Sequence, residues 1–404
     1  MGKSEKAKRV SAGLSRKHGL VVLLLLSMQA QAQSTKLLTP FVDVTYSRDN
    51  NLFRKPDDDA NPTGEQLGDS SVRAVAGLSL EKEFGLQKLS ARASLAKSKY
   101  AHFDFLDYDS RDAQLNFAWR LGSHLSGNVR SVRTNTLTPY IEFRENKRNL
   151  RVERSNVVDA AWRFHPSWRV RGSVDQLELT HDLLSQKYRD RTQTSSELWL
   201  DYLPATGSAF GLMLRHNTQR FPFAEVIGSQ NIINNQRGDE VKLKVDWKFS
   251  GKTQLQLLLG VANQKHEVVT ARDFRGVSAR LTGNWYPTGK LEVAGSIWRE
   301  IDATNNLSTN FAVSNGIRIA PAWNISPKLR LDGLFRYEKR VPVGVAGVEL
   351  TQVDKFATAS LTLTYVPLTH LQLITSLTRE TLNSNLPIRS FHSTGLSFNA
   401  HYEY

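Results

Sequence analysis

The sequence has no cysteine among its 404 residues, so its fold cannot depend on disulfide bonds. Long apolar runs are also scarce. After residues 20–26, no stretch approaches the roughly 20 apolar residues that a membrane-spanning helix needs. These absences exclude a disulfide-rich scaffold and a bundle of membrane helices. A transmembrane β-barrel remains compatible with the mean hydropathy of −0.39, because only every second residue of its strands faces lipid.

The N-terminus has the three parts of an export signal. Basic residues between Lys3 and Lys17 precede the apolar run Leu20–Leu26, and Ala30-Gln31-Ala32 forms an A-x-A cleavage site. We therefore predict a cleaved signal peptide over residues 1–32 and a mature domain over residues 33–404. The alternative is a retained membrane anchor, which the shortness of the apolar run disfavours. Part of the formal net charge of +14 belongs to this leader.

Beyond the leader, apolar and polar residues alternate with a period of two. In VKLKVDWKF (241–249), Val241 and Leu243 lie on one face of an extended chain, whereas Lys242 and Lys244 lie on the other. A helix would scatter the apolar residues around its circumference. The segment FVDVTYS (41–47) alternates in the same way, so its second, fourth and sixth residues are expected to face lipid. The pattern predicts strands along the whole mature chain.

Two kinds of connection separate the alternating segments. Short ones with Gly, Pro, Ser and Thr recur at 84–88, 121–124, 164–168, 203–208, 249–253, 286–290, 325–328 and 366–370. Longer polar segments lie between them, at 48–70, 97–110, 133–149, 179–192, 216–237, 265–274, 301–311, 340–353 and 380–390. Together they imply about eighteen strands. An even number places both termini on one side, with short turns there and long loops opposite, as in bacterial outer-membrane barrels.

We therefore predict an all-β fold, a transmembrane antiparallel up-and-down β-barrel of about eighteen strands with short periplasmic turns and long extracellular loops. Tryptophans next to short turns, such as Trp162 and Trp247, fit an interfacial aromatic girdle. The last strand alternates up to Tyr402 and Tyr404, and this aromatic end resembles the signal that the barrel-assembly machinery reads. The alternative is aromatic packing in a soluble β-sandwich. The predicted location is the outer membrane of a Gram-negative cell.

One segment near the start of the mature chain carries a family resemblance. YSRDNNLFRKPD (46–57) resembles the Tyr-x-x-Asp-Asn-Leu-Phe-Arg opening of EpsL-type outer-membrane proteins, which belong to exosortase/PEP-CTERM-associated polysaccharide operons. The matching residues are Tyr46, Asp49, Asn50, Asn51, Leu52, Phe53 and Arg54, with one residue more than the pattern. The resemblance implies a barrel that exports extracellular polysaccharide, or helps to export it, together with other export proteins. Related β-barrel porin families share similar openings, so a general diffusion porin is an alternative.

In each predicted strand, every second residue faces the barrel interior, and we call these positions the inward phase. They are rich in cations. The basic residues of the inward phase are Arg73, Arg92, Arg120, Arg130, Arg163, Arg169, Arg171, Lys242, Lys244, Lys248, Arg280, Arg318, Arg330 and Arg336. They outnumber its acids, which are Glu81, Asp159, Asp175, Glu197, Asp201, Glu240, Asp246 and Asp332. A barrel of 16–18 strands encloses an aqueous channel. Our hypothesis is that this net basic lumen attracts and passes an acidic polysaccharide, while the outer wall contacts membrane lipid. The alternatives are a porin wall of mutually paired charges and a structural barrel with a plugged lumen.

Two tryptophans also fall in the inward phase. Trp199 and Trp298 are candidates for stacking against sugar rings. The alternative is that they fill space or lie beneath a loop folded into the lumen.

Motifs for bond chemistry are missing from the sequence. It has no H-E-x-x-H, P-loop or dinucleotide-binding signature, and its ten histidines lack the spacing of metal ligands. We therefore expect no enzymatic activity, no metal and no cofactor. Positive charge is spread along the chain and not clustered, so nucleic acid is not an expected partner.

Overall fold

The computed structural model describes residues 37–404 except 57–65, 144, 228, 304–310 and 343–351. The predicted signal peptide over residues 1–32 lies outside the described residues. Within them, no helix has the length and apolar character needed to cross a bilayer.

The described chain consists mainly of β-strands. They are β1 (Leu38–Asp49), β2 (Asp69–Phe84), β3 (Gln87–Tyr100), β4 (Tyr108–Leu121), β5 (Leu125–Leu137), β6 (Leu150–His165), β7 (Trp168–His181), β8 (Arg191–Tyr202), β9 (Ala209–Arg220), β10 (Glu225–Ile227), β11 (Gln230–Ile232), β12 (Gln236–Ser250), β13 (Thr253–His266), β14 (Phe274–Trp285), β15 (Leu291–Ala303), β16 (Phe311–Ser326), β17 (Leu329–Pro342), β18 (Asp354–Leu368), β19 (Leu371–Ser384) and β20 (Phe391–Glu403). Short 3-10 helices lie in loops, at η2 (Asp104–Leu106), η3 (Leu184–Arg189), η4 (Thr270–Arg272) and η6 (Pro387–Arg389).

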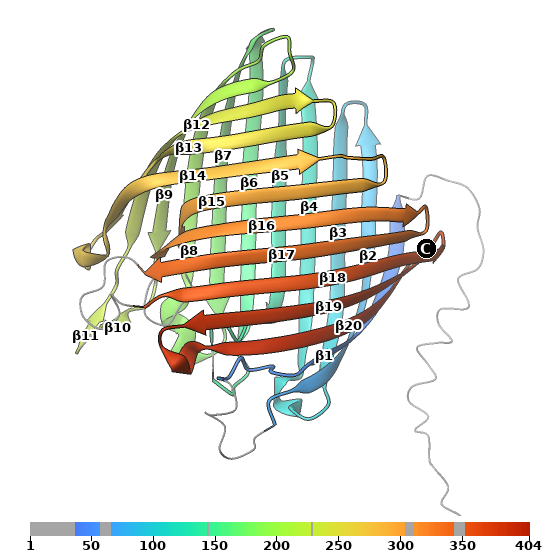
Figure 1. Ribbon diagram of the computed structural model, residues 1–404, viewed down its shortest axis with the longest axis vertical. Coiled ribbons are helices and arrows are strands. Elements are labelled where there is room, and N and C mark those ends of the chain that lie inside the picture. Colours follow the sequence, from blue (N-terminus) through green and yellow to red (C-terminus); the bar gives the residue numbers. More distant parts are fainter. Residues whose placement is uncertain (1–36, 57–65, 144, 228, 304–310, 343–351) are drawn as a thin grey trace, which may run out of the picture. The chain divides into compact units, whose positions relative to one another are not determined.

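These strands form a closed 18-stranded sheet. Neighbours in the sequence pair antiparallel, except that β9 pairs with β12 and β10 pairs with β11 in a separate hairpin. β20 pairs with β1, from Phe41 opposite Glu403 to Asp49 opposite Gly395. In Figure 1, strands β12 to β20 cross in front of β3 to β7, as tilted strands on opposite walls of a barrel do. The predicted fold class and strand number are confirmed.

The connections divide between the two ends of the barrel as predicted. Turns of a few residues join β2 to β3, β16 to β17 and the equivalent pairs, and we call this the short-turn end. The opposite, long-loop end holds the longer connections, including the β10–β11 hairpin between β9 and β12. Because all eighteen strands pair around a ring, no strand edge is left to lipid, which cannot satisfy backbone hydrogen bonds.

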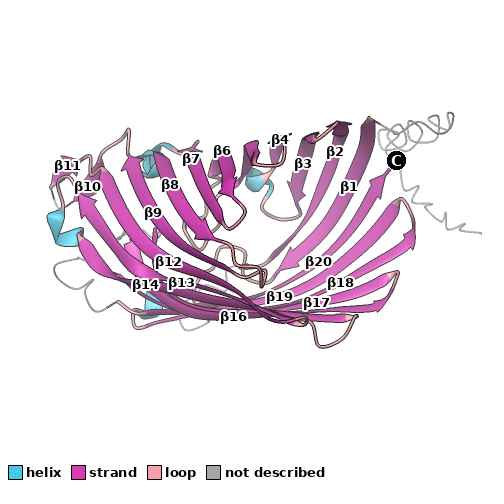
Figure 2. Cartoon of the chain, turned by 90° about the horizontal axis from the view of Figure 1, so that it is seen from above, coloured by secondary structure: helices cyan, strands magenta, loops and turns pink. Residues whose placement is uncertain are grey.

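The two faces of the wall differ as the alternation predicts. Val44 and Tyr46 point outward and are exposed, while Asp43 and Thr45 point inward and contact β20. The Asp43 Oδ1 atom lies 2.7 Å from Nδ1 of His401, and Thr45 Oγ1 accepts a hydrogen bond from Asn399. The wall is a single layer of strands (Figure 2), so one face meets lipid and the other lines the interior.

The tryptophans of the girdle lie on the outward face next to the short turns. Trp162, Trp168 and Trp285 are all exposed there. An aromatic ring with one polar atom is suited to the membrane–water interface. The short-turn end therefore marks one boundary of the lipid-facing band.

Candidate functional site: the inner wall and the long-loop end

Asp201 on β8 holds two of the predicted lumen cations. Its side chain is fully buried. It accepts hydrogen bonds from Arg169 Nη2 at 2.8 Å and from Arg171 Nε at 2.7 Å. Gly211 lies opposite on β9, where a Cβ atom would stand 2.6 Å from Asp201 Oδ1. Any larger residue at position 211 would displace the carboxylate on which both arginines depend.

We call a carboxylate together with the cations bound to it a node. Trp199 lies beside the node of Asp201, Arg169 and Arg171, and it is surrounded by charged side chains. The guanidinium carbon of Arg171 is 4.7 Å from the ring centroid, and Lys244 Nζ is 5.6 Å from it. The indole Nε1 donates a 2.9 Å hydrogen bond to Glu197. Both cations are within the range of a cation–π interaction. The ring therefore helps to hold cations on the wall in addition to filling space.

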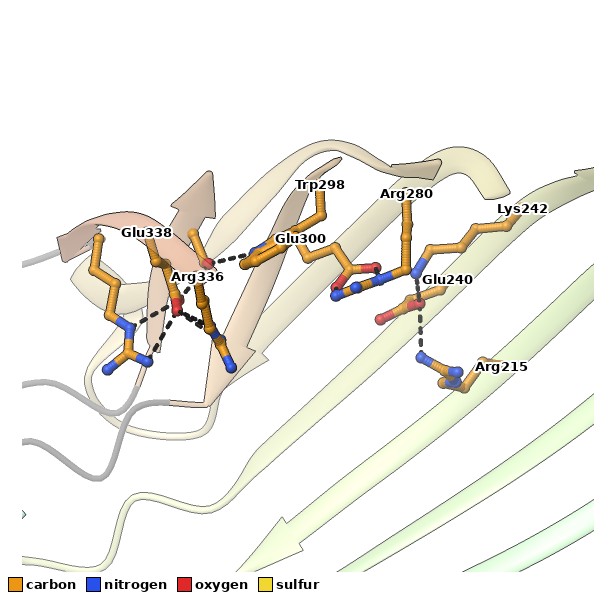
Figure 3. Close-up of polar contacts among 10 residues, drawn as sticks. Arg215, Glu240, Lys242, Arg280, Trp298, Glu300, Arg336 and Glu338 are labelled. Carbon is orange, nitrogen blue, oxygen red and sulfur yellow. Dashed lines mark hydrogen bonds and ion pairs between the residues drawn. The ribbon is translucent and has the colours of Figure 1, made fainter. Parts of the chain in front are cut away.

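A second node connects β8, β9 and β12. Arg215 reaches Glu197 at 2.7 Å and Glu240 at 3.1 Å, and Lys242 reaches the same Glu240 oxygen at 2.7 Å. Lys242 is buried, and Figure 3 shows it pointing toward Glu240, with Arg215 on the other side of that carboxylate. Within this node, cations and acids alternate, so each charge has an opposite charge beside it.

Glu338 on β17 is the centre of a third node. Its side chain is fully buried. It accepts hydrogen bonds from Arg336 Nη2 at 2.6 Å, Arg340 Nε at 2.8 Å and Ser314 Oγ at 2.5 Å. One carboxylate therefore fixes two guanidinium groups and the hydroxyl of a neighbouring strand.

Trp298 is covered by its neighbours. Its Nε1 donates to Ser314 Oγ at 2.9 Å, and the guanidinium carbons of Arg280 and Arg336 lie 5.0 and 5.2 Å from its ring centroid. Gly316 lies opposite, where a Cβ atom would stand 2.2 Å from the ring. Only 7% of the residue is exposed. Sugar stacking on Trp298 stays a prediction, and it would require the two guanidinium groups to move.

The predicted basic residues fall into two groups. Those within ion-pair distance of an acid are Arg73 (Asp112), Arg169 and Arg171 (Asp201), Lys242 (Glu240), Lys244 (Asp246), Arg280 (Glu300), Arg330 (Asp332) and Arg336 (Glu338). The others, for which the described part of the chain offers no such acid, are Arg92, Arg120, Arg130, Arg163, Lys248 and Arg318. Each cation of the first group is bound to an acid on the wall, although Asp201 and Glu338 each bind two arginines. Within the described residues, the cations of the second group have no such partner and add further positive charge.

Some charged residues of the wall were missed in the sequence. Glu338, Glu300 and Arg215 all bind predicted lumen residues or their partners. The sequence spacing could have identified Glu338, because residues two positions apart on a strand lie on the same face of the sheet. Arg336 and Glu338 are spaced in this way and bind each other.

The family-like segment at 46–54 forms a junction between the first and last strands. Asn51 Nδ2 donates to the carbonyl oxygen of His392 at 3.0 Å, and Asn50 Oδ1 accepts the backbone N–H of Thr394 at 2.6 Å. Asp49 Oδ1 accepts from Ser393 Oγ at 2.6 Å. These contacts lie where β20 begins, so the asparagines and the aspartate extend the barrel seam beyond the end of β1.

Arg54 turns the chain after this junction. Its φ of 54° is in the left-handed region, which a residue with a side chain seldom adopts. Its guanidinium binds Asp49 at 2.8 Å and Glu380 at 2.9 Å. These ion pairs hold Arg54 in this conformation, and the preceding residue, Phe53, packs among the neighbouring loops.

Phe53 is the centre of a hydrophobic core at the long-loop end. This loop core consists of Phe53, Leu106, Tyr140 and Phe143, which come from the β1–β2, β3–β4 and β5–β6 connections. The Phe53 ring is fully buried and meets the rings of Phe103 and Tyr140 edge-on, at 4.9 and 4.8 Å between centroids. Burial also raises the pKa of the Tyr140 phenol. Three long loops are thereby joined into one packed unit.

The C-terminal residues complete the seam at the short-turn end. Tyr402 is exposed on the outward face, opposite Val42, and the backbone N–H of Tyr404 donates to Pro40 at 3.1 Å. Their predicted role as an assembly signal stays a prediction. The pairing itself places an aromatic side chain beside lipid on the closing strand.

Comparisons with known proteins agree with this architecture. Residues 169–404 match the family described as "Putative beta-barrel porin 2". No curated protein sequence matches the chain. The structure of OpdK from Pseudomonas aeruginosa, solved with vanillate, aligns at 10% identity and a TM-score of 0.51, covering 91% of this chain and 99% of that one.

Two further structures align over similar lengths. OccK9 (OpdG) of Pseudomonas aeruginosa has 11% identity and a TM-score of 0.49, covering 91% of this chain and 98% of that one. OccAB3 of Acinetobacter baumannii has 9% identity and a TM-score of 0.47, covering 91% and 99%. At such identities the likeness to OpdK shows the fold alone. Because the family match covers more than half of the chain, the protein belongs to the "Putative beta-barrel porin 2" family and is a porin-like barrel of the outer membrane.

Proposed function

We propose that this barrel is a channel through which an acidic extracellular polysaccharide crosses the outer membrane. The observation that carries the proposal is the set of inward cations that no acid neutralises within the described residues, represented by Arg130 and Arg318. Arg318 lies opposite Arg336 on β17, and Arg336 already binds Glu338. The Arg318 guanidinium is therefore available for a carboxylate, which it can bind through two parallel hydrogen bonds.

The paired charges suit the passage of a polymer. Conduction requires contacts favourable enough to admit the polymer but weak and numerous enough to release it. The wall nodes at Asp201, Glu240 and Glu338 present donors that are already bound to a carboxylate, so each can bind a passing group only weakly. The unneutralised cations would attract the acidic polymer into the lumen. The nodes would then form and release weak contacts with it as it moves along the wall. Such passage involves no bond chemistry.

The family-like segment supports a role in polysaccharide export. It resembles the opening of EpsL-type proteins, and its residues form the seam junction and the loop core. Other export proteins would be needed as partners, because the barrel itself is confined to one membrane.

A general diffusion porin is the second candidate. The observation that favours it is the local pairing of wall charges, such as Arg73 with Asp112 and Arg280 with Glu300. A wall of compensated charges passes small solutes of either sign. The family description agrees with this function as well.

A deletion strain distinguishes the two candidates. Polymer export predicts that surface polysaccharide is lost and that polymer accumulates in the periplasm. A general porin predicts unchanged surface polysaccharide and reduced uptake of small solutes. Complementation with the wild-type chain should restore the missing property in either case.

Removing the unneutralised cations is expected to reduce anion preference. We expect the double substitution R130Q and R318Q to lower the anion-to-cation permeability ratio by about two- to fivefold at low salt, since two unit charges are removed from the wall. Reversal potentials in planar bilayers under a salt gradient measure this ratio. Arg169 and Arg171 are poor choices for such a test, because their loss would leave the buried Asp201 carboxylate without partners.

The matched control removes two arginines from the outward face, by R275Q and R379Q. These residues are exposed on strands β14 and β19, outside the lumen, so the permeability ratio should not change. An unchanged ratio in the R130Q/R318Q variant would refute the net basic lumen.

A further inference from the structure

The outward face changes from apolar to basic at the long-loop end. On β17, Phe335 and Tyr337 are exposed on the outward face, and Lys339 is the next residue in that phase. On β14, Val277 is exposed on the outward face and Arg275 follows it toward the long-loop end. The apolar band thus ends in a cation on each of these strands.

Seven such cations make up what we call the outer basic belt. They are Arg237 on β12, Lys265 on β13, Arg275 on β14, Arg299 on β15, Lys339 on β17, Lys355 on β18 and Arg379 on β19, and all are exposed. Within the described residues, none of the seven has an acid at ion-pair distance. The outward positions of β12 to β19 carry one acid in the described strands, Asp239, and it pairs with His216 at 2.7 Å.

Cations of the belt stand directly opposite one another. Arg237 faces Lys265 across the β12–β13 pair, and Lys339 faces Lys355 across the β17–β18 pair. Like charges in directly opposed positions destabilise a sheet, because their Cβ atoms are only about 4.5–5.5 Å apart. An anion between the two side chains would turn this repulsion into attraction.

One part of the belt also has a suitable shape. A groove of about 380 Å³ is lined by Arg220, Arg237 and Lys265. Glu267 is on the same groove, and its carboxylate accepts a hydrogen bond from Asn235. The groove is therefore lined by three cations and by one acid, and that acid already accepts a hydrogen bond.

The belt is confined to one level of the membrane. Outward residues of β14 are apolar or glycine from Trp285 near the short turn to Val277, and Arg275 follows. A band of that kind is about 25 Å tall in such barrels, so the belt lies at headgroup depth. At the short-turn end, the outward positions of the described strands hold a single cation, Lys82.

We infer that the outer basic belt binds the phosphate groups of anionic lipids in the leaflet that surrounds the long-loop end. Arginine and lysine are the side chains that bind phosphate most strongly, and a cation near an anionic lipid surface contributes about fivefold to binding. This site is separate from the lumen, so the inference does not depend on what the channel passes.

Lipid retention by the purified barrel tests this inference. The probe is lipid A carrying both phosphates, compared with dephosphorylated lipid A, each added to the barrel in a zwitterionic detergent and measured by native mass spectrometry. We expect the wild type to retain the phosphorylated form at least tenfold better, and salt to weaken this preference. We expect R237Q/K265Q/K339Q/K355Q to lose most of the preference.

A control variant removes four cations from the short-turn end, by K82Q/K252Q/K290Q/K328Q, and should keep the wild-type preference. Channel conductance and the heat-dependent gel shift of a folded barrel verify folding of both variants. Equal retention of the two lipid A forms by the wild type would overturn the inference. So would an equal loss of preference in the control, because retention would then reflect total charge and not the belt.

Discussion

Replacing Asp201 with asparagine is expected to destabilise the barrel by about 3–5 kcal/mol, because two guanidinium groups lose the buried carboxylate that neutralises them. The substitution preserves side-chain shape, so the effect isolates the charge. It also adds one net positive charge to the lumen and should increase anion preference. Urea unfolding of the barrel in lipid vesicles, followed by tryptophan fluorescence, measures the stability change.

The matched control is D332N. Asp332 binds Arg330 on the same inner wall, but both side chains are partly exposed, and such pairs contribute about 0–1 kcal/mol. If D201N and D332N unfold at the same urea concentration, the Asp201 node does not stabilise the wall.

Replacing Phe53 with alanine is expected to release the loop core. A fully buried phenylalanine loses about 3–5 kcal/mol of packing free energy when it is truncated, and the free energy of opening these loops should fall by a similar amount. The sheet should be unaffected, since Phe53 lies beyond the end of β1. Hydrogen exchange of amides in residues 100–107 and 137–143 reports the opening, while the unfolding midpoint reports the barrel.

Phe105 provides the comparison for this experiment. It lies near Phe53, with 6.5 Å between ring centroids, but it is 44% exposed. F105A should therefore reduce protection much less than F53A. Equal exchange in the two variants would mean that the loops are held by their backbone contacts and not by the aromatic core.

The strands and their faces could be predicted because they depend on local pattern. Alternation at 241–249 identifies a strand and its lipid-facing side from adjacent residues alone, and the turn residues mark where each strand ends. The structure confirms the strand number and the division into short turns and long loops. The β10–β11 hairpin was not predicted, since three-residue strands within a polar loop give too few alternations to recognise.

The contacts of the inner wall could not be predicted in the same way. Arg169 and Arg171 share Asp201 because of the register between β7 and β8, which depends on pairing across the sheet. Phe53 looked isolated among polar residues, because its partners Phe103 and Tyr140 come from two other loops. The contact between Arg336 and Glu338 is the exception that could have been predicted, because both residues lie on one strand, two positions apart.

The junction at Asp49, Asn50 and Asn51 has a consequence for biogenesis. Its partners at 392–394 lie at the start of β20, and the Asn51 contact joins residues 341 positions apart. Until β20 docks, the three hydrogen bonds to residues 392–394 cannot form, and only the local contacts, such as that of Asp49 with Arg54, hold the turn before Phe53. The junction can therefore form only when β1 and β20 pair, so a chain in which this pairing fails would have an incomplete loop region at the seam as well as an open sheet edge.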